Sequence, residues 1–425
     1  MQIDVAVVGA GLAGSCLAAG LADRGWNVML LERRSGAQHK VCGEFLSPES
    51  ASSLATLNLR EQVAALHPAP MTGACLISRR GTELSLHLPG TAWGISRYAL
   101  DQRLLQAASA AGADVREGVT VTAVAAEATG GYTLSGRDSA GKSLEMQARM
   151  AAIACGRHAL PGLRAGGQRS RARHTYVGVK CHYTGLQLAP EVRLYLFDGG
   201  YVGLSPIEGG RANFCLLATT DAFRRAGQRI PAMLDAPIAA NPALKRDLAG
   251  GERLPESMCA VAPVDTELVP ELLDPCLRLG DAVAMIPPLC GDGMAMAIRS
   301  AELAVPLLDN ALAGRCTLDT ARQAYAVAWQ RSFAGPLRTG RRLQRLLETP
   351  GLSGGLLGIG RLIPGLAQRL VRATRTGYVV LGRVHPYLPN PDRHGTACAI
   401  GRNGQREHTA CSRYARKALQ KSQKE

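Results

Sequence analysis

The first thirty residues contain two apolar runs separated by a helical segment. Ile3–Val8 is a run of mostly β-branched residues, which is typical of a buried strand. Small and apolar residues then continue through 15–24 as expected for a helix, and Gly25 marks its end. Residues 28–31 form a second apolar run. The pattern predicts a strand–helix–strand unit with parallel strands.

Beyond this unit the period of the apolar residues changes along the chain. A helix is expected over 98–111, a strand at 119–124, a hairpin of 132–135 with 144–148, and a strand at 150–154. From about residue 174, short strands at 176–183, 192–197, 201–204 and 212–217 alternate with Gly, Asp and Pro turns, which is typical of an antiparallel sheet. A strand at 277–279 and a helix over 294–312 follow, with a kink expected at Pro306.

The composition predicts a large folded core. Hydrophobic residues make up 46% of the 425 positions, and no stretch approaches the ~18 uninterrupted apolar residues of a membrane-spanning helix. The 12 cysteines are scattered without a C-x-x-C pair, so we expect free thiols in a reducing cytoplasm and no metal site. The chain opens directly on a strand, and we expect no signal peptide.

The net charge of +15 is concentrated at one end. Residues 331–425 carry 18 Lys and Arg against 4 Asp and Glu, which leaves 31 of the 49 basic and 30 of the 34 acidic residues in 1–330. A basic end suits an anionic membrane surface, a nucleic acid or an acidic partner. Nucleic acid is not expected, because the segment has few aromatic residues for stacking on bases and no recognisable module.

The first chemical motif is the glycine pattern between the first strand and the first helix. Gly9 permits a tight turn, Gly11 lets the backbone approach a pyrophosphate, and Gly14 lets the helix pack closely on the strand. In this position, directly after a strand, the pattern predicts a dinucleotide site. The alternative is a structural glycine turn.

The residues around the glycines fit the same interpretation. Leu12 and Ala13 begin the helix, whose free N–H groups and positive dipole end would face the phosphates. Glu32 ends the second strand 18 residues after Gly14, where its carboxylate can accept hydrogen bonds from ribose hydroxyls, and Arg33 lies beside it.

Two later segments decide between NAD and FAD. Arg97-Tyr98-Ala99-Leu100-Asp101 opens a helix, and Gly280-Asp281 ends a late strand ahead of Pro287-Pro288-Leu289-Cys290-Gly291-Asp292-Gly293. Together with the N-terminal glycines, these segments resemble the FAD-binding triplet of class A flavoprotein monooxygenases and their relatives. The resemblance covers about residues 1–310 and implies FAD as the cofactor.

The resemblance also implies a role for each segment. Arg97 would contact the FAD phosphates, and Asp281 would bind the ribityl chain. The loop with Pro288 and Gly291 would pass the isoalloxazine ring. The helix beginning at Gly293 and Met294 would direct its positive end toward the N1/O2 edge of the flavin, where the reduced ring is anionic. Further cofactor contacts are expected at Val121, Gly156 and Gly280.

Two other segments are similar to the geranylgeranyl reductase and FixC-like branch of this superfamily. Val41-Cys42-Gly43-Glu44-Phe45-Leu46-Ser47-Pro48 follows the second strand, and Gly200-Tyr201-Val202-Gly203-Leu204-Ser205-Pro206 lies mid-chain, with Asn213 on the next strand. In that branch a cysteine–glycine loop lies near the flavin, which implies cofactor contacts for Cys42 and Gly43. A Tyr-x-(Trp)-x-x-Pro strand lines its substrate cavity, and Gly203 stands where the branch usually has Trp.

Cys42 and Tyr201 are therefore the candidate catalytic residues. Cys42 has two interpretations, a proton donor or a small residue that packs on the flavin, since nothing in the sequence indicates a lowered thiol pKa. The electron donor is expected to be NAD(P)H or another reductant. Class A hydroxylases carry Asp-Gly after the third strand, where this chain has Cys155-Gly156-Arg157. The missing acid indicates either a different donor or a changed loop.

The expected fold is α/β with an α+β second domain: a Rossmann-like FAD-binding domain with a βαβ start, an antiparallel-sheet substrate domain and a C-terminal helical layer. The FAD-binding domain is expected to be discontinuous, with residues 1–80, 97–165 and 270–312. The substrate domain takes 81–96 and 166–269. A basic helical region takes 313–395, and a disordered basic tail takes 396–425.

Three functions stay open at this point. A monooxygenase acting on an aromatic or polyketide-type secondary metabolite is slightly favoured, because hydroxylation is common in this fold. A flavin-dependent C=C reductase of a prenyl or lipid-like substrate is favoured by the segments around Cys42 and Tyr201. Both would take an apolar molecule, since Phe45, Leu46 and Ile286 are expected around it. The third is a non-enzymatic flavin-binding partner protein that acts through its basic end.

An apolar helical face is expected near the C-terminus. Leucines and isoleucines recur there at spacings of 4, 3, 4, 3 and 4, at Leu352, Leu356, Ile359, Ile363, Leu366 and Leu370. Arginines accompany them, among them Arg369 and Arg375. Residues 352–425 would then bind peripherally to an anionic membrane, on an otherwise cytoplasmic protein. The alternative is a helical layer packed on the substrate domain.

Overall fold

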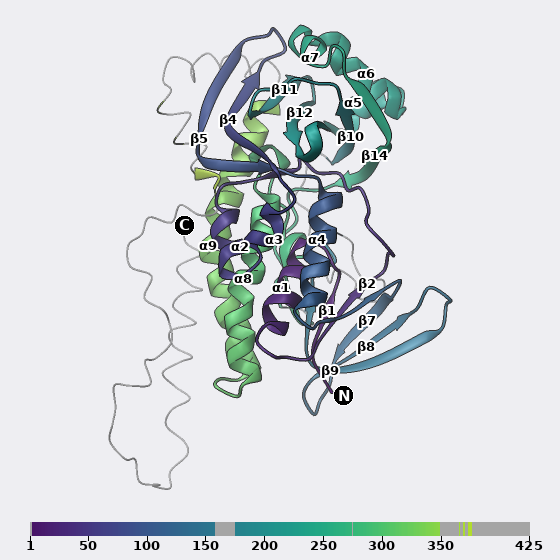
Figure 1. The fold of residues 1–425 in the computed structure, drawn as a ribbon, viewed down its shortest axis with the longest axis vertical. Helices are drawn as coiled ribbons and strands as arrows, with labels where there is room; N and C mark the ends of the chain where they lie inside the picture. The colour runs from purple at the N-terminus through teal and green to yellow at the C-terminus, as the bar shows by residue number, and fades with distance from the viewer. Residues whose placement is uncertain are drawn as a thin grey trace. The chain divides into compact units, whose positions relative to one another are not determined.

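A computed structural model describes residues 2–157, 175–273 and 275–348, together with Gly365, Arg369 and 373–375. Contacts divide the chain into residues 1–379 and 380–425, and every described residue belongs to the first unit. This unit is built on two sheets, which occupy the lower and the upper part of Figure 1.

The first sheet has seven strands in the order β6-β2-β1-β9-β8-β7, and β15 also pairs with β9. Its strands are β1 (Ile3–Val8), β2 (Val28–Glu32), β6 (Asp114–Glu117), β7 (Thr120–Ala126), β8 (Tyr132–Arg137), β9 (Ser143–Ile153) and β15 (Leu277–Arg278). β1 pairs in parallel with β2 and with the end of β9, β2 pairs in parallel with β6, and β15 pairs in parallel with the end of β9. β8 pairs in the antiparallel direction with β7 and with the start of β9. The βαβ start predicted from the sequence is present.

β9 corrects one expectation, because residues 144–148 and 150–154 were expected as two strands. They form a single strand that changes partners along its length. Leu144 lies opposite Gly136 of β8, and Met150 lies opposite Val5 of β1. The first half alternates between exposed and buried positions, whereas the second half is buried on both faces. The sequence pattern therefore changes within one strand.

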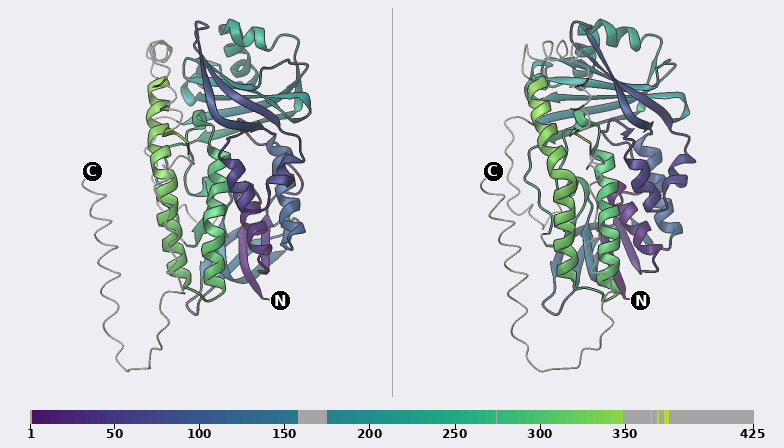
Figure 2. Two further views of the ribbon diagram at one scale, coloured as in Figure 1. Left: turned by 60° about the vertical axis from the view of Figure 1, so that its left-hand side comes forward. Right: turned by 90° about the vertical axis from the view of Figure 1, so that its left-hand side faces the viewer.

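Helices cover one face of this sheet. α1 (Leu12–Ala22), α4 (Arg97–Ala110), α8 (Gly293–Leu312) and the long α9 (Leu318–Glu348) share one core with it, and α9 runs beside α8 (Figure 2). Alternate residues of β1 divide between two cores. Val5 and Val7 pack under the helices, while Ala6 and Val8 pack on the other face with residues of β7 and β8. Because both faces are covered, β1 is apolar and buried from Val5 to Val8.

The second sheet has eight strands in the order β14-β10-β13-β12-β11-β4-β5-β3. They are β3 (Phe45–Leu46), β4 (Ala69–Ile77), β5 (Glu83–Gly94), β10 (Tyr176–Thr184), β11 (Glu191–Phe197), β12 (Gly200–Ile207), β13 (Arg211–Thr219) and β14 (Glu252–Val264). Most neighbours are antiparallel, as predicted, but β11 and β4 are parallel. β3, β4, β5 and β14 are not among the strands that the apolar pattern indicated, although the residues of β5 and β14 were expected in this sheet's domain.

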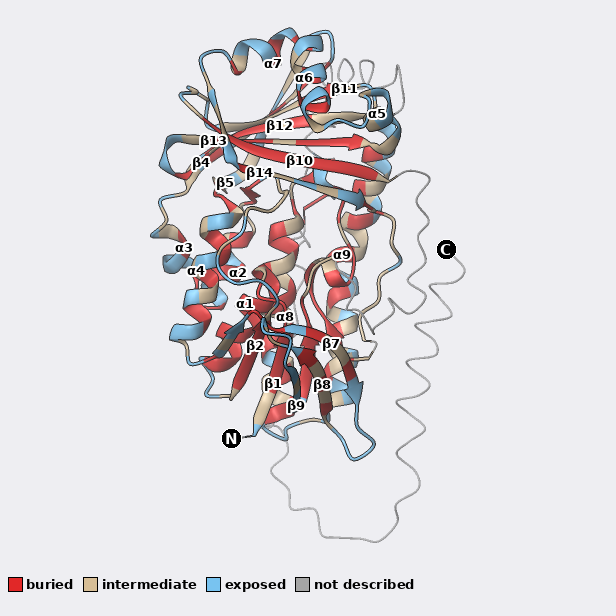
Figure 3. Ribbon diagram, turned by 90° about the vertical axis from the view of Figure 1, so that its right-hand side faces the viewer, coloured by how far each residue is buried: buried red, intermediate tan, exposed pale blue. Residues whose placement is uncertain are grey.

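The two faces of the second sheet pack against different parts of the protein. Its outer face packs against α6 (Ile230–Ala240) and α7 (Pro242–Asp247), with Val179 and Cys181 of β10 in that core. Lys180 and His182 alternate with them and so lie on the inner face. β10 is buried along almost its whole length (Figure 3). The inner face therefore places charged side chains inside the protein.

The domain boundaries stay a prediction, since residues 1–379 form one unit by contacts. One difference is nevertheless clear. β4 lies in 1–80, which was expected in the FAD-binding domain, yet it pairs with β11 and β5 of the second sheet. β5 follows β4 directly, but β11, which joins β4 to the rest of the second sheet, lies more than a hundred residues away, so local pattern could not assign β4.

The C-terminal helical layer is represented by α9. No helix in the described ranges is long and apolar enough to span a bilayer. The expected apolar face from Leu352 to Leu370 and the tail over 396–425 lie outside the described residues, so membrane contact through 352–425 stays a prediction. Arg375, expected to accompany that face, is instead buried beside the ring of Phe45, with Cζ 5.4 Å from the ring centroid.

Candidate functional site

The glycine turn after β1 has the steric features that a dinucleotide site requires. Gly9 has a φ of +102°, and a Cβ there would lie 2.7 Å from the carbonyl oxygen of Ala154. A Cβ on Gly14 would lie 1.9 Å from the carbonyl oxygen of Gly9, so only glycine lets α1 pack on the turn. A Cβ on Gly11 would meet nothing within 4 Å. Gly11 thus borders open space, which a pyrophosphate site at this turn requires.

The start of α1 leaves its backbone amides available. Gly11 is the N-cap and provides no side-chain cap, and the first turn holds no acidic residue. Such uncapped N–H groups attract an anion. Glu32 reaches the same turn, where its Oε2 accepts a hydrogen bond from the Ala10 amide at 2.9 Å. Leu12 and Ala13 are buried in the helix, and Arg33 is exposed.

The late Gly280-Asp281 segment lies against this helix start. A Cβ on Gly280 would lie 3.3 Å from Cβ of Ala13 and 3.5 Å from Cβ of Ala297. Further along, a Cβ on Gly20 would meet Val305 at 2.8 Å. These contacts advance in the same direction along α1 and α8, so the two helices are parallel. Their N-termini therefore approach the same edge of the first sheet (Figure 1).

The start of α8 is also without a side-chain cap. Asp292 is its N-cap and is fully buried, but its Oδ1 accepts a hydrogen bond from Ser47 Oγ at 2.7 Å instead of binding the helix amides. Gly291, just before it, has a φ of +67° and lies close to Phe45. Met294 is buried in the first turn. The loop with Pro288 and Gly291 thus brings a second uncapped helix start to the site.

Arg97 belongs to a charged group at the start of α4. Its Nε and Nη2 donate to Asp101 at 2.8 and 2.9 Å, and Lys40 Nζ donates to the same carboxylate at 2.6 Å. Burial would lower the pKa of Arg97, but the Asp101 carboxylate outweighs it and the pKa is raised. Burial raises the pKa of Asp281, against the opposing effect of Arg157 and Arg97. The electrostatic coupling between Arg97 and Asp281 connects these two predicted cofactor contacts.

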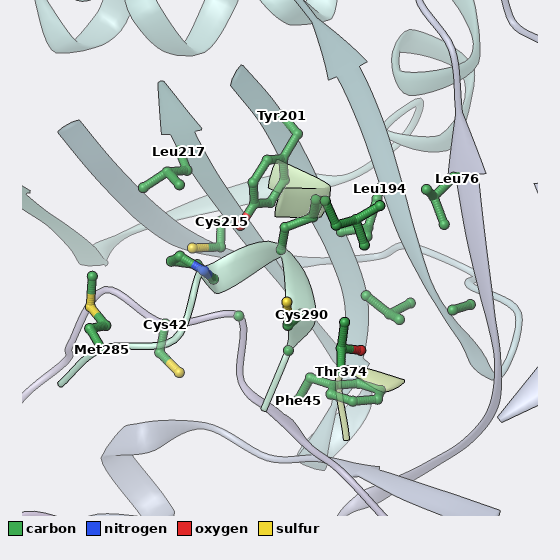
Figure 4. Close-up of a pocket in the computed structure, with 18 of the residues that line it drawn as sticks. Cys42, Phe45, Leu76, Leu194, Tyr201, Cys215, Leu217, Met285, Cys290 and Thr374 are labelled. Carbon is green, nitrogen blue, oxygen red and sulfur yellow. The ribbon is translucent and has the colours of Figure 1, made fainter. Parts of the chain in front are cut away.

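A cavity of about 550 Å³ lies between these loops and the inner face of the second sheet. Cys42, Gly43, Asp281, Pro288 and Gly291 line it from the side of the loops. Figure 4 shows Cys42, Cys290, Cys215 and Tyr201 around the same space, with Leu194 and Leu76 farther along. Thr374 and Arg375 contribute to its wall as well. The cavity therefore joins the predicted flavin position to an apolar chamber.

The apolar chamber follows one row of residues across the second sheet. Strand register places Cys215, Gly203, Leu194, Leu76 and Leu84 side by side on β13, β12, β11, β4 and β5. All five line the cavity. Four steps of about 4.8 Å between strands give a row about 19 Å long. Gly203, the second residue of the row, leaves a gap between Cys215 and Leu194, since a Cβ there would meet nothing nearer than 3.5 Å.

The two candidate catalytic residues both line this cavity. Burial raises the pKa of Cys42, although the Arg97 guanidinium nearby opposes this effect. The thiol is therefore protonated at neutral pH, which suits a proton donor better than a nucleophile. Tyr201 lies on β12, two residues before Gly203, at the side of Leu217. Its ring forms part of the same wall (Figure 4).

Val121 and Gly156, two further expected cofactor residues, do not line the cavity. Val121 lies on β7, opposite Gly136 of β8, and is buried in the core on the face of the first sheet that the helices do not cover. Gly156 follows β9 with a φ of +66°, next to Cys155, whose Cα a Cβ on Gly9 would meet at 2.7 Å. Gly156 thus lies next to the glycine turn, whereas Val121 packs in the core of the first sheet, away from that turn.

A buried charge cluster was not predicted from the sequence. It consists of the buried Glu44, Lys180 and His182, with the half-buried His39 at its edge. Lys180 Nζ and Glu44 Oε1 are 2.8 Å apart, and both side chains are fully buried. His182 Nε2 and Glu44 Oε2 are 2.7 Å apart, and Lys180 Nζ lies 3.2 Å from His39 Nδ1. The alternation of Lys180 and His182 in an apolar strand was the only signal, and it did not reveal the partner.

Comparison with known proteins agrees with this geometry. The family described as "FAD binding domain" matches residues 2–330. Menaquinone reductase of Mycobacterium tuberculosis is 26% identical over 325 residues, which cover 72% of this chain and 76% of that protein. Digeranylgeranylglycerophospholipid reductase of Methanosarcina mazei is 25% identical over 350 residues, with coverage of 77% and 81%.

A solved structure shows the same fold. A geranylgeranyl bacteriochlorophyll reductase-like protein of Thermoplasma acidophilum superposes with a TM-score of 0.69 at 21% identity, covering 88% of this chain and 99% of that one. The α/β fold class and the predicted FAD dependence are thereby confirmed, and the non-enzymatic alternative is set aside. The chain belongs to the FAD-binding-domain family and is an FAD-dependent oxidoreductase related to the geranylgeranyl reductases.

Proposed function

We propose that FAD lies with its pyrophosphate at the start of α1 and its ring at the start of α8. The residues present fit such a molecule, because two uncapped helix starts converge and Gly11 borders open space. Gly9, Gly14, Glu32 and Gly156 would form the wall around the nucleotide. Arg97 and Asp281 would contact the middle of the cofactor, and Gly43, Pro288, Gly291 and Met294 would surround the ring.

Glu32→Ala tests the nucleotide end of this assignment. The Ala10 amide loses its acceptor, and the ribose loses a charged hydrogen-bond partner worth about 1.5–3 kcal/mol. We expect the Kd for FAD, measured by quenching of flavin fluorescence on titration into apoprotein, to rise by about tenfold to a hundredfold. Glu117→Ala is the control, since Glu117 lies opposite Glu32 on β6 and its carboxylate accepts from the amide of Gly36 in the loop after β2. Equal affinity of the Glu32 variant and the control would reject the assignment.

We further propose that the enzyme reduces a C=C bond in a prenyl or lipid-like chain. The observation that carries this proposal is the apolar row from Cys215 to Leu84, which continues from the predicted flavin position as one cavity. Its length of about 19 Å suits an extended chain of roughly fifteen carbons joined by C–C bonds of about 1.5 Å. Relatives named as reductases of menaquinone and of a digeranylgeranyl lipid support the same substrate class.

Hydroxylation of an aromatic metabolite has less support. It rests on analogy with the fold. Of the described residues that line the cavity, Phe45 and Tyr201 are aromatic, and the far wall is aliphatic. Such a wall holds a chain by apolar burial but offers little stacking surface for a planar ring. We therefore place reduction ahead.

In this reaction bound reduced FAD would supply a hydride to one carbon of the double bond. The protein would bind and orient the chain along the apolar row, which also keeps water away from the reacting carbons. Cys42 Sγ–H would give a proton to the other carbon, so that one hydride and one proton are added across the bond. The thiolate left behind would regain a proton from water entering after product release. Tyr201 would position the double bond against Cys42.

Cys42→Ala and Cys42→Ser test the proton donor. General acid catalysis contributes about 10²–10⁴-fold to the rate, so we expect kcat of the alanine variant to fall by that factor. The kcat of the serine variant should fall less, because its hydroxyl can still donate a proton. Because the pKa of Cys42 is raised above its ordinary value of 9.0, the donor stays protonated up to that pH and is lost as pH rises further. The alkaline fall of the kcat–pH profile should therefore begin above pH 9 and disappear in the alanine variant. Full turnover in the alanine variant would leave Cys42 a packing residue.

The reaction itself is tested with two substrates under two atmospheres. Geranylgeraniol and a planar polyketide aromatic are each incubated with the enzyme and a chemical reductant, with and without oxygen. We expect a product with two added hydrogen atoms from the prenyl alcohol without oxygen. A product with an added oxygen atom, formed from the aromatic and dependent on O₂, would instead establish hydroxylation.

A further inference from the structure

Glu44 and Lys180 form an ion pair within the protein interior. Both side chains are 0% exposed, and they join the segment before β3 to β10 of the second sheet. Removing two such charges from water costs several kcal/mol each, and their attraction repays this only when the geometry is good and all hydrogen bonds are made. A buried pair close to a reactive residue therefore calls for a reason other than stability.

The backbone conformation of Glu44 also indicates a role other than stability. Glu44 has a φ of +52°, in the left-handed region where a residue with a Cβ is disfavoured by roughly 1–2 kcal/mol. Glycine would adopt this conformation without strain. The strained glutamate is thus present for its carboxylate, and strain of this kind gathers at functional sites.

The carboxylate of Glu44 connects three parts of the protein. Oε1 accepts from Lys180 Nζ at 2.8 Å and from the Arg97 amide at 2.9 Å, and Oε2 pairs with His182 Nε2 at 2.7 Å. Burial alone would raise the pKa of Glu44, but His182 and Lys180 outweigh it and the pKa is lowered. The carboxylate is therefore charged, and it fixes its own backbone between α4 and the second sheet.

The two residues before Glu44 are held by the same sheet. Asn213 Nδ2 donates to the carbonyl oxygen of Cys42 at 3.1 Å, and Ser205 Oγ donates to that of Gly43 at 3.5 Å. Register places His182 opposite Asn213, and Asn213 opposite Ser205, on three adjacent strands. Consecutive residues from Cys42 to Glu44 thus each bind one strand of a single polar row. The amide of Glu44 also donates to Cys42 Sγ at 3.4 Å.

We propose that Glu44, held by Lys180 and His182, is a positioning residue that fixes the Cys42 thiol at the cavity wall. Glu44 does not itself touch the reacting atoms. It determines the path of the backbone that carries Cys42. This backbone is held against the polar row formed by His182, Asn213 and Ser205 on the second sheet. This inference rests on the proposed function only for the role of the thiol as proton donor. The placement of the thiol can be tested without substrate or cofactor.

The decisive variant is the double substitution Glu44→Gln with Lys180→Met in the full chain. Lys180→Met alone would leave a buried unpaired carboxylate, which costs about 3–5 kcal/mol and could prevent folding. The double variant removes both charges together, and such replacements are often neutral or stabilising. Its melting temperature and FAD affinity should therefore stay close to those of the unchanged protein.

Placement of the thiol is measured by the rate at which iodoacetamide alkylates Cys42 in apoprotein, followed by peptide mass spectrometry. We expect this rate to rise by about tenfold in the double variant, because the local opening of the 42–44 segment becomes less costly by about 1.4 kcal/mol. In turnover with the prenyl substrate, kcat should fall while KM stays constant, since the apolar row is unchanged.

Tyr195→Phe is the matched control. Tyr195 is also buried in the second sheet, and its hydroxyl donates to Asp247 at 2.5 Å, but its neighbours are on the outer face. Removing that hydroxyl should leave Cys42 alkylation unchanged. A folded double variant with an unchanged alkylation rate would overturn the positioning role and leave the cluster as structural. Faster alkylation without any reduction of the prenyl substrate by the unchanged protein would uphold the positioning role while rejecting the proposed reaction.

Discussion

Gly14→Ala is expected to destabilise the protein by about 3 kcal/mol, at the upper end of the cost of overpacking a core. The added Cβ would lie 1.9 Å from the carbonyl oxygen of Gly9 and 3.2 Å from Cβ of Ala154. Neither backbone can yield without separating α1 from β1 and β9. The free energy of unfolding, obtained by urea titration of the apoprotein, should fall accordingly.

Gly11→Ala is the matched control, three residues after the end of β1 in the same turn. A Cβ at Gly11 meets nothing within 4 Å, so the apoprotein should be as stable as before. The methyl group would occupy the space in front of the α1 amides, where we propose the pyrophosphate. FAD affinity should then fall by about tenfold or more. If both variants lost stability equally, the role assigned to Gly11 would be wrong.

Gly203→Leu is expected to lower activity toward a long substrate far more than activity toward a short one. The side chain would fill the gap between Leu194 and Cys215 in the apolar row. Relieving such an obstruction costs about 1–3 kcal/mol, so kcat/KM for a long prenyl substrate should fall by roughly tenfold to a hundredfold. A short prenyl alcohol, which does not reach past β12, should lose much less.

The same substitution separates a pocket role from a structural one. Glycine inside a strand costs stability. Nothing at position 203 excludes a side chain, because Gly203 has no left-handed φ and a Cβ there would make no contact under 3.5 Å. The melting temperature of Gly203→Leu should therefore be equal or higher. Gly136→Leu is the contrasting control, because a Cβ on Gly136 would lie 2.7 Å from the carbonyl oxygen of Thr120. A drop in stability at Gly203 with no chain-length dependence would contradict its role in the substrate cavity.

Some features of this protein follow from local sequence. The turn at Gly9, Gly11 and Gly14 is read from neighbouring residues, because a strand, a tight turn and an uncapped helix start are contiguous in the chain. The strands of the second sheet that alternate with Gly and Pro turns were found for the same reason. Family membership and the cofactor follow from motifs of this kind.

Other features could not be found from local pattern. β4 belongs to the second sheet because it pairs with β11, more than a hundred residues away. β9 was divided in two because its environment changes halfway along the strand. Arg375 was expected beside an apolar face that either meets a membrane or packs on the substrate domain, and it is buried beside Phe45; an apolar spacing does not tell which surface a helix meets.

The sequence by itself determined what depends on neighbouring residues: the phosphate-binding turn, the helix starts, the strand alternation and the candidate thiol at Cys42. The features that depend on residues far apart in the sequence were decided only by the tertiary structure. Glu44 and Lys180 are 136 positions apart in the sequence and 2.8 Å apart in space. Their pairing, like the apolar row across five strands, arises from strand register and sheet packing, and no residue pattern encodes which strand will lie beside which.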